Sequence, residues 1–326
     1  MNYWLRGISK WLPMVITLLA LFWIVSYLID RKKFESPISK NIDSEGIREE
    51  SFPSENDTNK SSSKSTEQEE FSTVSIEKLE SEAKSVFQLR GLPGKELFFL
   101  PNDRRPYTGW LRNLEKDGLK RIWEVRDGLR DGSSHFVDAK KIIRTESYSR
   151  GRLDGLTTEW YENGQKKMEV VFRNGLKNGM ETEWFENGQV KHEYEYAEDF
   201  KNGSFRTWFK SGVLHKKGNY LEGKLDGEFV EYHSNGKPME SWKYSKGVPN
   251  GPYLSWYENG NKKNEHAYEH GKTHGSYKSW HRTGTKRYDG QFIHGKKDGQ
   301  WTFFFENGVE MYSKTYKDGV EVTKND

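Results

Sequence analysis

From Gly151 onward the chain repeats a pattern every 24 residues, and this period limits the folds that it can adopt. A fixed period of this length is typical of repeat proteins, in which each short unit packs only on its neighbours. The sequence therefore predicts a repeat array rather than one or two compact domains. One glycine marks the same place in seven consecutive units: Gly155, Gly179, Gly203, Gly227, Gly251, Gly275 and Gly299.

A second turn signal follows nine residues after each of these glycines. An Asn-Gly pair between aromatic runs strongly favours a β-hairpin, because a type I′ turn needs positive φ at both central residues. The first set of glycines follows Asp or Asn in most units and is predicted to form the return turn. Each unit is thus expected to be two short antiparallel strands and two turns. The glycines of the Asn-Gly pairs are Gly164, Gly188, Gly236, Gly260 and Gly308.

Aromatic side chains occupy fixed places in the same pattern. Equivalent positions of stacked hairpins lie above one another, so these columns are predicted to form aromatic ladders that stabilise the sheet. A face of exposed Trp and Tyr that stacks on sugars or peptides is the alternative. One column, before the Asn-Gly turn, contains Trp160, Trp184, Trp208, Tyr232, Trp256 and Trp280. A second, on the returning strand, contains Phe172, Tyr196, Tyr220, Tyr244, Tyr268 and Tyr316. A third contains Phe205, Phe229, Tyr253, Tyr277 and Trp301.

Residues 11–29 carry no charge and are long enough to cross the roughly 30 Å hydrocarbon core of a bilayer. They predict a transmembrane signal anchor within residues 1–30. A cleaved signal peptide, whose apolar region is usually shorter, is the alternative. Basic residues flank both sides, so the positive-inside rule does not decide the orientation. The short N-terminal tail before a large C-terminal region favours an array outside the cytoplasm.

The segment between the anchor and the array has two parts. Residues 31–73 are rich in Ser, Glu, Lys and Asn and are predicted to be a disordered linker. Residues 74–96 predict a short helix and a connector, and the helix is expected to pack on the first repeat, a partner-binding helix being the alternative. The apolar residues at helical spacing are Ile76, Leu79, Ala83, Val86 and Phe87. Degenerate repeats follow over residues 97–150, regular repeats over 151–320, and a tail over 321–326.

The composition argues against several chemistries. The chain has no Cys, which excludes disulfides, thiolate metal sites and a Cys nucleophile. Its net charge is +3, with no clustered basic face of the kind that nucleic-acid binders carry. No glycine spacing is followed by the residues of a phosphate-binding loop. We therefore predict no catalytic site and no cofactor.

A group of histidines could bind a metal such as Zn²⁺. These residues fall at different positions of the repeat and mostly near turns, which favours the absence of a metal site. The group contains His266, His270, His274 and His281.

The segment Tyr161-Glu-Asn-Gly164, with Glu169 to Phe172 and Gly175-Leu-Lys-Asn-Gly179, resembles the variant class of MORN repeats. Such repeats fill bacterial proteins often labelled YwqK-family antitoxins. The resemblance covers roughly residues 100–320 and implies an all-β repeat array, an elongated meander of antiparallel hairpins that is used for interaction. Looser hairpins are expected where the sequence departs from the pattern, at Asp199, Ser211, Thr283 and Ala139-Lys140.

The combined expectation is a single-pass protein of the bacterial inner membrane with an extracytoplasmic MORN-like solenoid. It would act as a non-catalytic scaffold that binds another protein. Two alternatives stay open: an antitoxin or immunity-like protein that neutralises a toxin, and binding of envelope glycan or anionic lipid. The lysines that follow the turns could touch lipid headgroups, although solvated charge that blocks strand aggregation explains them as well.

Overall fold

The computed structural model describes residues 76–92, 95–114 and 118–322. The predicted membrane anchor at 11–29 and the predicted linker at 31–73 lie outside the described residues. Within the described part of the chain, no helix is both long and apolar enough to cross a membrane.

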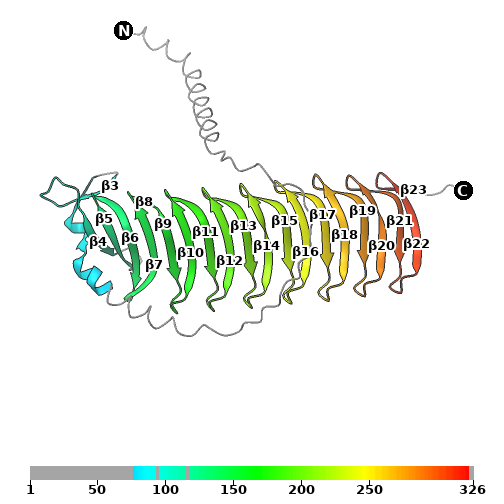
Figure 1. Cartoon of the computed structure of the whole chain (residues 1–326), viewed down its shortest axis with the longest axis horizontal. Coiled ribbons are helices and arrows are strands. Elements are labelled where there is room, and N and C mark those ends of the chain that lie inside the picture. Colours follow the sequence, from blue (N-terminus) through cyan, green and yellow to red (C-terminus); the bar gives the residue numbers. More distant parts are fainter. Residues whose placement is uncertain (1–75, 93–94, 115–117, 323–326) are drawn as a thin grey trace, which may run out of the picture. The chain divides into compact units, whose positions relative to one another are not determined.

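One 21-stranded sheet contains all the repeats, and the predicted all-β meander of antiparallel hairpins is confirmed. Consecutive hairpins lie side by side in chain order (Figure 1). A separate two-stranded sheet, β2–β3, precedes the array. The strands are β1 (Lys84–Ser85), β2 (Arg90–Leu92), β3 (Lys95–Phe99), β4 (Gly109–Leu114), β5 (Lys120–Arg126), β6 (Leu129–Asp138), β7 (Lys141–Ser149), β8 (Arg152–Leu153), β9 (Gly155–Trp160), β10 (Lys166–Arg173), β11 (Leu176–Trp184), β12 (Val190–Ala197), β13 (Phe200–Trp208), β14 (Leu214–Leu221), β15 (Lys224–Tyr232), β16 (Pro238–Ser245), β17 (Val248–Trp256), β18 (Lys262–Glu269), β19 (Lys272–Trp280), β20 (Lys286–Ile293), β21 (Lys296–Phe304), β22 (Glu310–Lys317) and β23 (Val320–Val322).

The two-residue type I′ turns were predicted at the Asn-Gly pairs. They lie instead at the opposite end of the hairpins. Asn174 and Gly175 both have positive φ, 52° and 90°, and directly join β10 to β11. The same geometry holds at Glu198 and Asp199, with φ of 50° and 69°, although no glycine is present there. The expectation of a looser hairpin at Asp199 is therefore wrong, because Asp tolerates the left-handed conformation.

The Asn-Gly pairs form a three-residue loop instead. Gly164 has positive φ, whereas Asn163 does not. The N–H of Gly164 donates to the carbonyl of Tyr161 at 2.9 Å, and the N–H of Tyr161 donates to the carbonyl of Gln165 at 2.8 Å. This pattern matches a tight turn followed by one left-handed glycine, the next most common hairpin connection.

The first set of glycines lies inside strands, and their predicted turn role is wrong. Gly179 has a φ of 125° and pairs with Tyr196 of the next strand. On its other side the pairing jumps from Glu181 opposite Val170 to Lys177 opposite Phe172, so the strand bulges at the glycine. A turn and a bulge both need positive φ, which explains why the sequence pattern did not separate them. The equivalent glycines all have positive φ and lie in strands: Gly155, Gly203, Gly227, Gly251, Gly275 and Gly299.

A short helix covers the beginning of the array. Residues 76–82 are helical, and Ile76 and Ala83 are buried against Ile122 and Val137 of the first hairpins. The helix ends earlier than its apolar spacing predicts. The chain instead pairs through β1, parallel to β4, and continues in a 3-10 turn, η1 (Val86–Gln88). The side chain of Phe87 is consequently 86% exposed.

Candidate functional site

A single row of side chains runs across the strands on one face of the sheet and forms most of the core of the regular repeats. We call it the central row and the face that carries it the inner face. Cross-strand pairing links Val170 to Glu181, Glu181 to Tyr194, and Tyr194 to Phe205. The row consists of Thr157, Val170, Glu181, Tyr194, Phe205, Gly218, Phe229, Trp242, Tyr253, His266, Tyr277, Gly290 and Trp301.

Ring contacts connect the aromatic members of this row from β12 to β21, with Tyr244 of the returning-strand column bridging Phe229 and Trp242. Tyr194 stacks on Phe205 with ring centroids 5.5 Å apart, and Trp242 meets Tyr253 at 4.3 Å. Two glycines make room for rings from neighbouring strands. A Cβ on Gly290 would lie 2.3 Å from the Trp301 ring, and one on Gly218 would lie 2.9 Å from Phe205.

The predicted returning-strand column lies beside the central row on the inner face. Tyr220 packs on Phe205 at 4.9 Å, and Tyr316 packs on Trp301 at 6.4 Å. Tyr268 contacts both Trp242 and Tyr253. The rings of this column stay partly exposed. These rings therefore pack on the central row and also remain accessible at the surface.

The predicted Trp column does not form a ladder. Within the described residues, no ring contact joins neighbouring members of this column, which are two strands, or roughly 9.5 Å, apart. The strand between two members of this column contributes a non-aromatic partner, such as Lys166 opposite Trp160 and Lys262 opposite Trp256. Lysines lie over several of its rings instead: Lys166 lies 5.8 Å from Trp184 and Lys262 lies 5.2 Å from Trp280. The column contains Trp160, Trp184, Trp208, Tyr232, Trp256 and Trp280.

The inner face carries an ion-paired group on β7, before the aromatic part of the row begins. Glu146 is buried and accepts from Arg121 at 3.0 Å and from Arg144 at 2.6 Å. The Tyr148 hydroxyl donates to the same carboxylate at 2.8 Å. An ion-paired group thus lies at β7, between the apolar core of β4 to β6 and the aromatic rings of the later hairpins.

Glu181 lies directly before the aromatic part of the row. His192 and then Lys177 stabilise its carboxylate and lower its pKa to about 2. A perturbed carboxylate can mark a reactive site. Here it sits in a row position that a ring occupies one repeat later, at Phe205, and it fills that space as an ion-paired group.

The turns of consecutive repeats are joined to one another by hydrogen bonds. The side-chain amide of Asn163 donates to the carbonyl of Glu186 at 3.0 Å, and that of Asn235 donates to Glu258 at 2.8 Å. The Tyr161 hydroxyl donates to the carbonyl of Trp184 at 2.8 Å. The recurrent Asn therefore connects repeats as well as shaping its own turn.

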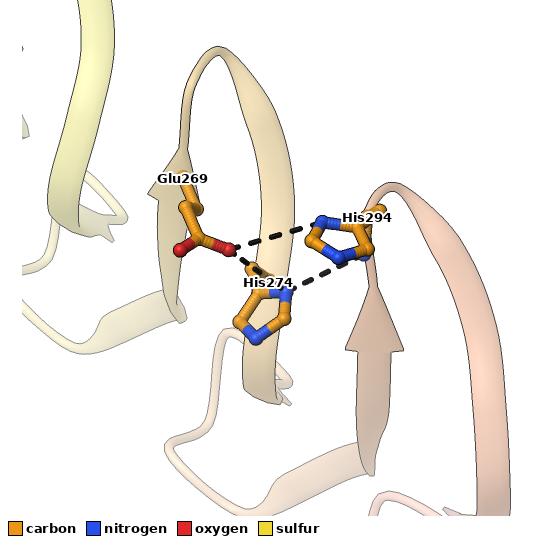
Figure 2. Close-up of side chains that lie close together, drawn as sticks. All are labelled: Glu269, His274 and His294. Atoms are coloured by element: carbon orange, nitrogen blue, oxygen red, sulfur yellow. Dashed lines mark hydrogen bonds and ion pairs between the residues drawn. The ribbon is translucent and has the colours of Figure 1, made fainter.

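The structure disperses the predicted histidine group. His266 is buried in the central row, His270 is in a return turn, and His281 is at the opposite end of its hairpin, where it contacts the carbonyl of Phe304. Only His274 joins a possible ligand cluster, with Glu269 and His294 (Figure 2). This trio could not be predicted from the sequence, because its members belong to two consecutive repeats.

Two of the cavities over the described residues come nearest to a binding pocket. One, of about 260 Å³, lies beside Trp256, Lys263 and Arg282. The other, of about 320 Å³, lies beside Phe87 and Leu114 at the start of the array. Small-molecule pockets typically occupy about 300–1,000 Å³ and enclose most of their ligand. Neither cavity therefore supports a small-molecule site. The inner face of the sheet is the larger candidate for a binding surface.

These features define a single-layer β-hairpin repeat protein. Five segments match the family model of the MORN repeat variant: residues 153–174, 177–198, 225–246, 249–270 and 297–318. These five segments are accordingly MORN-type repeats, which supports the resemblance to MORN-repeat proteins. Between these matches, β13–β14 and β19–β20 form the same hairpin, although their turns contain Ser211 and Thr283 in place of Asn. No curated protein matches the chain.

Proposed function

We propose that this protein is a non-catalytic scaffold whose inner face binds another protein. The observation that carries the proposal is the row of partly exposed returning-strand rings, held in place by the largely buried aromatic core that runs from Tyr194 in β12 to Trp301 in β21. MORN repeats are in general binding repeats for proteins or membranes. A binding role is therefore the one for which this array is suited.

The chemistry of the surface favours a protein as the ligand. Tyr and Trp are enriched at protein interfaces, where they bury a large apolar area at low cost in conformational entropy. Neighbouring rings hold the tyrosine rings in position. The ring centroids of Tyr244 and Phe229 lie 6.1 Å apart, and those of Tyr268 and Trp242 lie 5.4 Å apart. Prepositioned rings lose little freedom on binding.

The scaffold is proposed to be tethered to the membrane through residues 11–29, with the array outside the cytoplasm. The uncharged composition of that segment supports the tether. Protease treatment of spheroplasts tests the orientation. Digestion of the array in intact spheroplasts supports an external array, and resistance until lysis contradicts it.

Site-specific photocrosslinking tests the binding face. A photoreactive phenylalanine analogue replaces Tyr220, Tyr244 or Tyr268 in the full-length chain in membranes. The matched controls carry it at Asn219 or Lys243, which neighbour these tyrosines in sequence and point to the opposite face of the sheet. Crosslinked protein is then identified by mass spectrometry.

Protein crosslinks from the tyrosine positions and none from the controls would support the proposal. Crosslinks that come equally from both faces, or only to lipid or glycan, would contradict it. If the crosslinked protein is a toxin encoded next to this chain, the scaffold is an immunity-like factor of the kind that the YwqK-family resemblance suggests.

A further inference from the structure

We propose that Glu269, His274 and His294 form a binding site for one divalent transition-metal ion, with Zn²⁺ as the best-fitting ion. Glu269 ends β18, His274 lies in β19, and His294 begins the turn after β20. The trio therefore joins the return-turn ends of two consecutive hairpins (Figure 2).

The distances between the ligand atoms are close to those of a tetrahedral site. One Glu269 oxygen, Oε2, lies 3.4 Å from Nδ1 of His274 and 3.8 Å from Nδ1 of His294. One ligand atom from each residue lies within 4.8 Å of the others. Ligands about 2.0–2.1 Å from a tetrahedral Zn²⁺ lie roughly 3.4 Å from one another, so small rotamer changes suffice to close the site.

The donor set matches the ion. Two imidazoles and one carboxylate are the ligands of several zinc sites that keep a fourth position for water. Nitrogen ligands also suit Cu²⁺ and Ni²⁺, whereas Ca²⁺ and Mg²⁺ prefer oxygen alone. The side chains are 47%, 40% and 66% exposed for Glu269, His274 and His294, which leaves a path for the ion and for water.

The site stands apart when the repeats of this chain are compared with one another. The residue at the position of His274 is Asp or Asn at every other junction of the regular array. The position of Glu269 holds no other carboxylate. The corresponding trios are Ser149, Asp154 and Asn174; Arg173, Asn178 and Glu198; Ala197, Asn202 and Glu222; Leu221, Asp226 and Lys246; Ser245, Asn250 and His270; and Ile293, Asp298 and Asp318.

The Nδ1 lone pair of His274 is directed at the main-chain N–H of His294. Its Nδ1 accepts a hydrogen bond of 3.4 Å from the N–H of His294, the same bond that Asp or Asn accepts at other junctions. This assigns the proton of neutral His274 to Nε2 and leaves Nδ1 able to ligate a metal. A metal bond would replace a long, weak hydrogen bond.

Isothermal titration of the tag-free, full-length chain with ZnCl₂ tests the proposal. The variants are His274→Asn and His294→Asn, with His270→Asn as the matched control. Asn already stands at the corresponding positions as Asn250 and Asn174, so each variant keeps a residue that the repeat accepts. His270 begins the equivalent turn one repeat earlier and has no ligand trio around it.

The expected result is one Zn²⁺ per chain for the parent and for His270→Asn, with a higher melting temperature when the ion is bound. Both ligand variants should bind at least about tenfold more weakly. Co²⁺ in place of Zn²⁺ should give the visible absorption of tetrahedral coordination. The proposal is overturned if the parent binds no stoichiometric ion, or if His270→Asn weakens binding as much as His294→Asn.

Discussion

The Oδ1 atom of Asp226 accepts a hydrogen bond of 2.8 Å from the main-chain N–H of Lys246, the first residue of the next return turn. Asn202 and Asn250 accept the same bond from Glu222 and His270. The Asp or Asn before most of the bulge glycines is thus a connector between repeats. The sequence pattern predicts this Asp or Asn to be part of a turn, whereas in the structure it joins two repeats.

Replacing Asp226 with Ala should therefore weaken one junction between repeats. The variant leaves the Lys246 N–H without its partner, at a cost of about 1–2 kcal/mol. Hydrogen exchange at the Lys246 amide should become faster and the melting temperature should fall. Asp226→Asn is the control, since Asn makes this bond elsewhere in the array. Equal losses in the two variants would contradict a hydrogen-bonding role.

Gly290 should not tolerate a side chain while Trp301 is present. A Cβ there would lie 2.3 Å from the indole ring, so Gly290→Ala should destabilise the array by about 1–3 kcal/mol through overpacking. Gly218→Ala, with a closest contact of 2.9 Å to Phe205, should cost less. Thermal unfolding measures both variants.

A double-variant cycle separates this clash from other effects of the substitution. Trp301→Leu makes room beside residue 290, so the cost of Gly290→Ala should shrink in that background. If the two losses simply add, the ring does not cause the intolerance and the close packing of Gly290 against Trp301 is wrong.

Most of the fold could be predicted because its signals are local. Asn-Gly pairs, recurrent glycines and a strict period indicate hairpins without knowledge of any long-range contact. What the pattern could not tell was which positive-φ glycine turns the chain and which bulges a strand, since Gly175 and Gly179 satisfy the same conformational requirement.

The inner face was only partly predictable, for a reason of register. The central row mixes a carboxylate at Glu181, a ring at Phe205 and no side chain at Gly218. Its members on every second strand, from Phe205 to Trp301, are the predicted third aromatic column, whereas its members on the strands between share no residue type. Bulges separate the row from the returning-strand column. The recurring Trp residues near the turns form an obvious pattern in the sequence. Whether a side chain is buried, however, depends on its neighbours on the adjacent strands.

Glu181 should make the stability of the array sensitive to strong acid. Its folded-state pKa of about 2 lies below the ordinary 4.5, first because of His192 and then Lys177. The stabilisation is complete above pH 4.5 and is lost as the pH falls toward 2. Glu181→Gln should therefore melt below the parent at neutral pH, and the gap should narrow in acid.

The carboxyl carbon of Glu181 can be titrated directly by NMR. A midpoint near 2 is expected, with a shift toward the ordinary value in a His192→Gln variant. A midpoint near 4.5 in the parent chain would contradict the ion-paired role of this residue.

His266 should give a second, milder pH dependence. Its imidazole is stacked on the ring of Tyr277 and tilted against that of Tyr253, with a centroid distance of 4.6 Å to each, and its Nδ1 has no partner within the described structure. Burial lowers the pKa of His266 to about 4, against an ordinary 6.5. The unfolded chain therefore binds the proton more tightly, and stability is lost as the pH falls from 6.5 through about 4.

His266→Phe isolates this contribution, because the ring contacts remain while the titrating group is removed. The variant should be at least as stable as the parent at pH 7.5, since a buried nitrogen without a partner is lost. Its advantage should grow between pH 6.5 and 4, measured as the difference in melting temperature. Parallel curves for the two proteins across this range would mean that His266 is protonated in the folded array, and that the central row admits water at this position.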